Sequence, residues 1–204
     1  MTIEARLWLI AAVAFGAFAV LGFVVSHAPP LRIDLEGIAL RGRGVPIAAL
    51  LTTSGRGPAV FFLELFGVLI AFLQGWNIRL AIAIGLSQLL SQGAVEAFKH
   101  VFARPRPDDW LVRHELGFSY PSGHATTVVV FFAAWLLFIA FTPLPRGAKV
   151  VAAVALLAWM FGIDWSRVAL GAHYLTDVLG GTLFGVAWLS AMLALGVRLG
   201  LLAR

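Results

Sequence analysis

Three short stretches place cationic, imidazole and carboxylate side chains at spacings that suit chemistry on an anion. They run from Lys99 to Pro107, from Ser119 to Thr126 (SYPSGHAT) and from Ser166 to Asp177. Lysine and arginine bind anions, and histidine serves as a nucleophile or as a general acid or base. Each stretch adjoins a long apolar segment. We therefore expect these polar residues at places where hydrophobic helices begin or end.

The third stretch contains a histidine and an aspartate, His173 and Asp177, that are four residues apart. A helix would place both side chains on one face. A carboxylate next to an imidazole fixes its tautomer and makes the other ring nitrogen a better nucleophile or base. Arg167 lies shortly before the pair, and we expect it in a loop or at a helix start. Taken alone, the pair is more typical of a polar cap on a membrane helix.

The first stretch supplies two cations that can hold a phosphate. Lys99 closes a long apolar segment, and Arg106 follows seven residues later between two prolines, which end a helix and stiffen the backbone. The planar guanidinium of arginine matches phosphate oxygens, and lysine adds a point charge. A basic cluster that anchors the chain at the membrane interface is the alternative. We assign Arg104 and Arg113 to that surface role.

The second stretch has the features of a helix start that can bind an anion. Pro121 is suited to the first turn, so Ser122 and Gly123 would lie where the first backbone amides have no helical partner. Glycine lets an anion approach the backbone closely, and a helix N-terminus favours phosphate. His124 would then stand beside the phosphate as an acid. An N-cap serine next to an incidental histidine is the alternative.

Together, the three stretches predict one phosphoryl-transfer site. Such a site needs cations for the phosphate, a nucleophile and an acid for the leaving group. The predicted catalytic residues are His173, Asp177 and His124, and the predicted phosphate ligands are Lys99, Arg106, Ser122, Gly123 and Arg167. No metal or other cofactor is expected, because carboxylates are sparse and three fixed cations would repel a divalent ion while doing its electrostatic work.

These stretches resemble the signature motifs of the type 2 phosphatidic acid phosphatase (PAP2) superfamily. The motifs are Lys-x6-Arg-Pro, Pro-Ser-Gly-His and Ser-Arg-x5-His-x3-Asp, and all three match in order. The resemblance implies that His173 attacks phosphorus to form a phosphohistidine, that Asp177 orients it and that His124 protonates the leaving oxygen. It also implies metal-independent catalysis and, for a bacterial member, a site that faces the periplasm or outer surface of the inner membrane.

The composition is that of a polytopic membrane protein. Of 204 residues, 61% are hydrophobic and only 12% are charged, and the mean hydropathy is +0.94. Soluble domains carry about twice that share of charge. We predict an all-α bundle that forms one domain over residues 1–204, with the lipid bilayer around it. No nucleic-acid partner is expected, because the basic residues are scattered between apolar segments, and no obligatory protein partner is inferred.

Six apolar segments are long enough to cross a membrane as helices. They span residues 7–25, 58–74, 78–98, 124–142, 148–163 and 178–197. An even number of crossings puts both termini on one side. The loops at about 26–57, 99–123 and 164–177 share the opposite side, where all three motif stretches lie. The first of these loops mixes charged and apolar residues, which favours a short helix in the interface.

Two features of the topology carry alternatives. The first apolar segment is interpreted as a retained span, although Ser26-His27-Ala28 after it has the small-x-small pattern of a signal cleavage site. The three-loop side carries nine of the 15 basic residues, which by the positive-inside rule would place it in the cytoplasm. If the three motif cations are excluded from the count because they serve catalysis, each side carries six basic residues. The outward-facing site therefore rests on the family resemblance and not on charge.

The predicted function is removal of a terminal phosphate from a membrane lipid. The resemblance implies undecaprenyl pyrophosphate, phosphatidylglycerol phosphate, phosphatidate or lipid A as substrates, and an isoprenoid phosphate is preferred. A compact loop between Arg106 and Pro121 favours a lipid that enters sideways between helices. A lipid-to-lipid phosphotransferase on the same scaffold is the main alternative. A non-catalytic lipid transporter is another, although its polar residues would be expected at mid-membrane.

Overall fold

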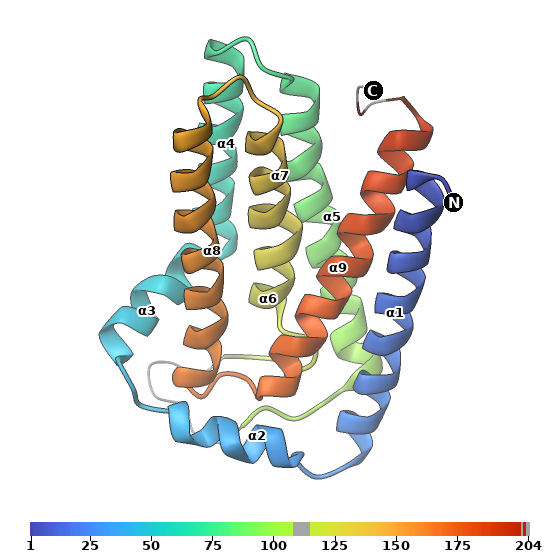
Figure 1. Ribbon diagram of the computed structural model, residues 1–204. Helices are drawn as coiled ribbons and strands as arrows, with labels where there is room; N and C mark the ends of the chain where they lie inside the picture. The colour runs from blue at the N-terminus through green and yellow to red at the C-terminus, as the bar shows by residue number, and fades with distance from the viewer. Residues whose placement is uncertain (108–114, 201, 203–204) are drawn as a thin grey trace.

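The computed structural model describes residues 1–107, 115–200 and 202, and all regular secondary structure within them is helical. Long helical segments form an elongated bundle (Figure 1). They are α1 (Ile3–His27), α4 (Gly57–Leu73), α5 (Ile78–Phe102), α6 (Gly123–Thr127) continued by the π-helical turn η2 (Val128–Ala133) and α7 (Ala134–Ala140), α8 (Arg146–Ala169) and α9 (Leu175–Arg198). Each predicted apolar segment is thus found as a helix.

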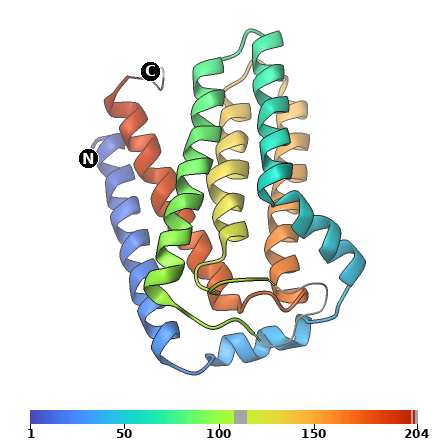
Figure 2. The same ribbon diagram turned by 180° about the vertical axis from the view of Figure 1, so that it is seen from behind.

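By length and composition, five helical segments qualify as membrane spans. Helix α4 qualifies only together with α3 (Val45–Ser54), from which it is bent by 57°. Counting that pair as one broken span gives the six predicted crossings. The start of α1 and the end of α9 lie at the same end of the bundle, as an even count requires (Figures 1 and 2). The predicted class, an all-α polytopic membrane protein, is confirmed.

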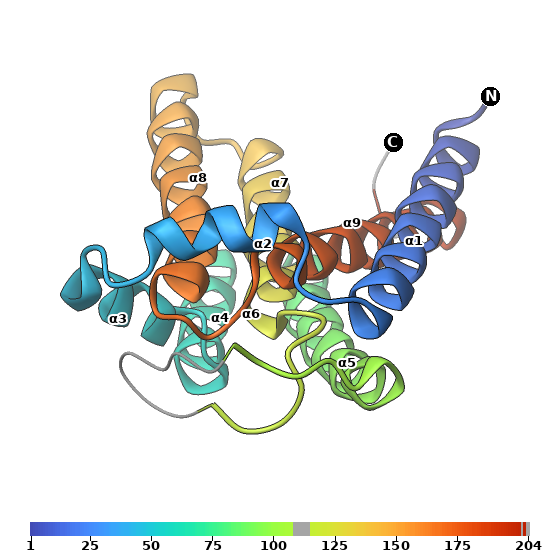
Figure 3. The ribbon, with the colours of Figure 1, turned by 90° about the horizontal axis from the view of Figure 1, so that it is seen from below.

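The loop between the first two spans contains short helices that cross the other end of the bundle. Helix α2 (Arg32–Gly37) and the 3-10 turn η1 (Ile38–Leu40) run across this end near α8 and α9 (Figure 3). The buried Asp34 fixes α2 there, because its carboxylate accepts a hydrogen bond of 2.9 Å from the Thr176 amide at the start of α9. The expected interfacial helix therefore covers the end where the motif loops gather.

Helices α1 and α9 hold the second motif stretch from two sides. The ring of Tyr120 stacks on that of Phe18 in α1, and its hydroxyl donates to the Phe18 carbonyl at 2.6 Å. On the α9 side, a Cβ at Gly181 would clash with the Ser122 carbonyl, so only glycine permits this close approach. The loop is therefore fixed in place by packing that lies outside the motif itself.

Glu64, to which the sequence assigned no role, links three helical segments. Its carboxylate accepts hydrogen bonds from the Gly85 amide of α5 at 3.1 Å and from the Trp135 indole of α7 at 3.0 Å. Buried carboxylates need such donors in apolar surroundings. We interpret Glu64 as a packing residue that joins α4 to its neighbours.

Candidate active site

A cavity of about 230 Å³ lies where the three motif stretches meet. Six of the eight predicted site residues line it: Lys99, Arg106, Gly123, His124, Arg167 and His173. The other two, Ser122 and Asp177, are fully buried and do not line the cavity. The structure thus brings the predicted residues together, with two of them behind the cavity wall.

His173 and Asp177 are close together, although they do not share a helical face as predicted. His173 lies in the loop before α9, and Asp177 lies in the first turn of that helix. The Tyr174 amide donates to Asp177 Oδ2 at 2.8 Å, which folds the loop back over the helix start. His173 Nδ1 is consequently 3.6 Å from Asp177 Oδ2. The predicted pairing holds, but a helix cap produces it.

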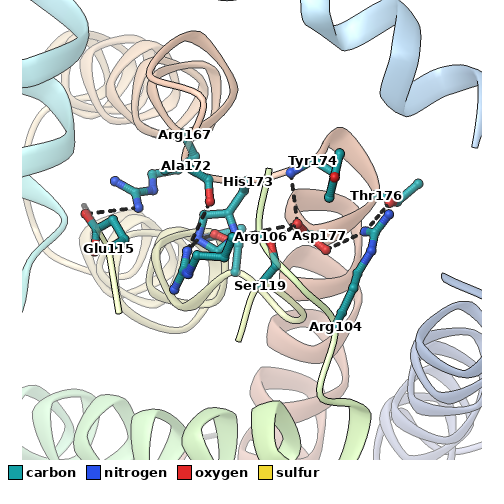
Figure 4. Close-up of polar contacts among 12 residues, drawn as sticks. Arg104, Arg106, Glu115, Ser119, Arg167, Ala172, His173, Tyr174, Thr176 and Asp177 are labelled. Atoms are coloured by element: carbon teal, nitrogen blue, oxygen red, sulfur yellow. Dashed lines mark hydrogen bonds and ion pairs between the residues drawn. The ribbon is translucent and has the colours of Figure 1, made fainter. Parts of the chain in front are cut away.

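The polar contacts around His173 fix its tautomer (Figure 4). Arg106 Nη1, which can only donate, lies 3.2 Å from His173 Nε2, so Nε2 carries a lone pair. The proton is then on Nδ1, which lies 3.4 Å from Ser119 Oγ, and the Ser119 hydroxyl in turn donates to Asp177. Asp177 therefore orients the imidazole partly through Ser119. In the sequence, only the position of Ser119 within the second motif stretch pointed to this residue.

The environment of His173 also favours its neutral form. Burial lowers the pKa of His173 well below its ordinary value, and nearby cations, of which Arg106 is the strongest, lower it further. An imidazole with a lowered pKa stays unprotonated at neutral pH, so Nε2 keeps the lone pair that a nucleophile needs.

Lys99 and Arg106 reach the cavity from the end of α5 and the loop after it. Lys99 forms an ion pair with Glu96, three residues earlier on α5, at 3.0 Å between Nζ and Oε2. The Arg106 guanidinium donates to three backbone carbonyls at 3.0–3.2 Å, those of Leu116, Gly117 and Ala172. These contacts fix the planar group beside His173.

Arg167 lies in the last turn of α8, and not in a loop or at a helix start as expected. It is almost fully buried, and its guanidinium donates to the Thr52 hydroxyl. The Thr52 carbonyl lies 3.0 Å from His124 Nε2. Because a carbonyl only accepts, Nε2 carries a proton, and Nδ1 is the nitrogen left for proton transfer. Thr52 thus positions both groups, a role that no motif in the sequence indicated.

Ser122 contributes to the scaffold around the site. Its amide donates to the Asp177 carbonyl at 3.0 Å, and its hydroxyl caps α6 by accepting from the Ala125 amide at 3.4 Å. These bonds join the start of α6 to the start of α9. The neighbouring Gly123 does line the cavity.

Arg104 is buried, which corrects its predicted role as a surface charge. Only 3% of the residue is exposed, and its guanidinium bridges Asp177 Oδ1 at 2.5 Å, as Figure 4 shows, and Asp34 Oδ2 at 2.8 Å. It also donates to the Thr176 hydroxyl at 2.7 Å and stacks 4.3 Å from the Tyr174 ring centroid. Arg104 therefore holds Asp177 from the side opposite His173 and links it to α2.

Replacing Arg104 by glutamine should lower the stability of the fold by about 3–5 kcal/mol, because two buried carboxylates lose their counter-charge. Thermal unfolding in detergent measures this change. A second substitution, Asp34→Asn, should restore part of the loss by removing one of those charges. Arg32→Gln is the matched control, since Arg32 is exposed and pairs only with Glu36 in the described structure. An unfolding midpoint of Arg104→Gln equal to that of the wild type would contradict this assignment.

A second ion pair at the cavity was not predicted. Glu115 Oε1 accepts from Arg56 Nη2 at 2.9 Å and lies 3.4 Å from Arg167 Nη2, so it offsets part of the positive charge. Arg56 comes from the junction of α3 and α4, and both side chains line the cavity. Arg113 lies outside the described residues, as does part of the loop predicted to be compact.

The fold matches that of a known membrane protein. The structure superposes on the crystal structure of a transmembrane PAP2-type phosphatidylglycerolphosphate phosphatase from Bacillus subtilis with a TM-score of 0.77. The match covers 95% of this chain and 98% of that one, at 22% sequence identity. This likeness shows that the chain has the fold of that membrane-spanning helical bundle.

The chain belongs to the PAP2 superfamily, as its motifs indicated. Residues 76–200, which contain all three motif stretches, match that family. A phosphatidylglycerophosphatase B of Bacillus subtilis is 32% identical over 167 residues, which are 80% of this chain and 74% of that protein. A lipid A 1-phosphatase of Rhizobium johnstonii is 38% identical over 110 residues, which are 48% of this chain. The chain spans only 39% of the length of that second relative.

Proposed function

We propose that the protein removes a phosphate group from a membrane lipid through a covalent phosphohistidine on His173. The observation that carries this proposal is the position of His173, which lines the cavity and whose Nε2 bears a lone pair 3.2 Å from an arginine. A neutral nucleophile beside fixed cations is what attack on a phosphate dianion requires, because the cations offset charge repulsion.

The reaction proceeds in two displacements. His173 Nε2 forms a bond to phosphorus while the bond from phosphorus to the lipid oxygen breaks, and His124 donates a proton to that oxygen. A water then attacks the phosphohistidine, the bond from phosphorus to nitrogen breaks, and His124 takes up the proton of the water. Lys99, Arg106 and Arg167 bind the phosphate oxygens throughout, with the Gly123 backbone beside them.

The protein is an integral membrane protein, and we place it in the inner membrane of a bacterium with the motif loops facing the periplasm. This orientation follows from the resemblance to the PAP2 superfamily and not from the distribution of charge. The chain has no cysteine, so a single cysteine at the exposed Leu116 reports the side directly. Labelling by a membrane-impermeant maleimide in spheroplasts supports the outward orientation, and labelling only after lysis contradicts it.

Phosphate release from a lipid panel by the purified protein tests the function. The panel contains phosphatidylglycerol phosphate, phosphatidate, undecaprenyl pyrophosphate and lipid A, and release from at least one of them is expected. Transfer of the phosphate to another lipid with none released would indicate a phosphotransferase. Turnover of none of these lipids, together with binding of one, would indicate a transporter.

Activity should persist in excess chelator, because Lys99, Arg106 and Arg167 supply the positive charge that a metal would otherwise provide. Phosphate release is measured with and without chelator at constant ionic strength. Loss of activity in chelator that magnesium or zinc restores would rule out this part of the mechanism.

A further inference from the structure

A groove lies between α7 and α8 at the end of the bundle opposite the motif loops, where a short turn joins these two helices (Figure 1). It has a volume of about 380 Å³, against about 230 Å³ for the active-site cavity. Its walls are mostly apolar and include Leu137, Ile139, Val150 and Ala153. Leu137 and Val150 are exposed, so the groove opens on the outer surface of the bundle. A groove of this size and polarity suits an acyl chain of the surrounding bilayer.

Two cations lie at the end of the groove that is nearest the turn. Arg146 and Lys149 are in the first turn of α8, and both line the groove. Lys149 Nζ donates a hydrogen bond of 2.7 Å to the carbonyl of Ala140, the last residue of α7, which holds the ammonium group beside the groove. An ammonium has three protons, so two remain for a ligand. None of the described residues that line the groove is acidic, and neither cation forms an ion pair within the described structure.

The position of these two charges is unfavourable for α8 itself. The dipole of a helix favours negative charge in its first turn and positive charge in its last. The first turn of α8 nevertheless contains two basic residues and no acidic one. An anion bound between Arg146 and Lys149 would offset both their mutual repulsion and their interaction with the dipole. The groove therefore combines apolar walls with a place for a negatively charged group.

We propose that the groove binds a membrane phospholipid with an anionic headgroup, whose phosphate contacts Arg146 and Lys149 and whose acyl chain lies between α7 and α8. A zwitterionic lipid offers the same phosphate but adds a cation that these two residues repel. In the proposed orientation this end of the bundle faces the cytoplasmic leaflet, whose anionic lipids are attracted to basic residues. The site is separate from the active-site cavity, so the inference does not depend on the phosphatase function.

Lipid binding to the delipidated protein in detergent tests the site. Native mass spectrometry compares phosphatidylglycerol with phosphatidylcholine that has the same acyl chains. The wild type should bind the anionic lipid about 10- to 30-fold more tightly, the size expected of two basic residues near a membrane surface. Arg146→Gln combined with Lys149→Gln should bring this preference close to one. Arg79→Gln combined with Arg198→Gln is the matched control, because it removes the same charge from the same end of the bundle but away from the groove, and it should keep the preference.

A further variant keeps the test decisive if the loss of both cations impairs folding. Ala153→Phe fills the apolar part of the groove and keeps both charges, and it should weaken the binding of phosphatidylglycerol. Equal binding of the two lipids by the wild type would overturn the inference, and so would an unchanged preference in the Arg146 and Lys149 double variant. An equal fall in both double variants would indicate general attraction to a basic surface and would also overturn it. A dimer that Ala153→Phe dissociates would show that a second copy of the chain occupies the groove instead.

Discussion

Replacing His173 by alanine is expected to abolish phosphate release, with a loss of kcat/KM of about 10⁴-fold or more. The loss should be this large because the variant lacks the group that forms the covalent intermediate. His173 Nε2 is the ring nitrogen that carries the lone pair in the cavity, and Nδ1 is occupied on the side of Ser119 and Asp177. Rapid alkaline quenching of wild-type protein with radiolabelled substrate should trap the phosphohistidine, and the variant should show no label.

His100→Ala is the matched control for this experiment. His100 lies on the same side of the bundle, at the end of α5, but it is exposed and does not line the cavity. Its removal should leave turnover within about twofold of the wild type, as for most surface substitutions. Turnover of His173→Ala within tenfold of the wild type would remove this residue from the role of nucleophile.

The chemistry of the site is more predictable from sequence than its architecture. Lys99, Arg106 and the two motif histidines were identified from residue type and spacing, because phosphate transfer needs cations and imidazoles whatever the fold around them. The pairing of His173 with Asp177 was predicted for the wrong reason. A separation of four residues suggests one helical face, but the cap at Tyr174 begins the helix after His173.

Arg104 and Arg106 show what local sequence reasoning missed. Each precedes a proline, which disfavours helical backbone, and in an extended chain side chains two residues apart would point the same way. Here Arg104 contacts Asp177 while Arg106 contacts the other side of His173, so the backbone between them is irregular. The burial of Arg104 depends on α2 supplying Asp34 from 70 residues away. No local sequence pattern predicts the contact between Arg104 and Asp34.

Arg56, Thr52 and Glu115 were missed for a related reason. Arg56 lines the cavity, and Thr52 contacts Arg167 and His124, because α3 and α4 meet at a 57° bend, which is a tertiary feature. Glu115 lines the cavity from the loop after α5. In sequence, Arg56 and Glu115 are isolated charges in loops, which are usually solvated. Their role becomes visible only when Glu115 is seen between two guanidinium groups.

Replacing His124 by alanine should have an effect that depends on the leaving group. A lipid alcohol is a poor leaving group and needs its oxygen protonated, whereas a nitrophenolate leaves readily without help. General acid catalysis contributes about 10² to 10⁴ in rate. The rate of the variant should therefore fall by that factor on a lipid monophosphate and by far less on nitrophenyl phosphate. A diphosphate should fall between them, because its leaving phosphate is of intermediate quality.

The two histidines can be separated by measuring kcat/KM of both alanine variants on all three substrates. His173→Ala should be inactive on each, because the leaving group does not affect the need for a nucleophile. The Thr52 carbonyl lies 3.0 Å from His124 Nε2 and occupies that nitrogen, so a proton that His124 gives to the leaving group has to come from Nδ1. Equal fractional losses of His124→Ala across the substrates would mean that this histidine positions phosphate and is not the acid. Activity of His173→Ala on nitrophenyl phosphate alone would show that the two roles are reversed.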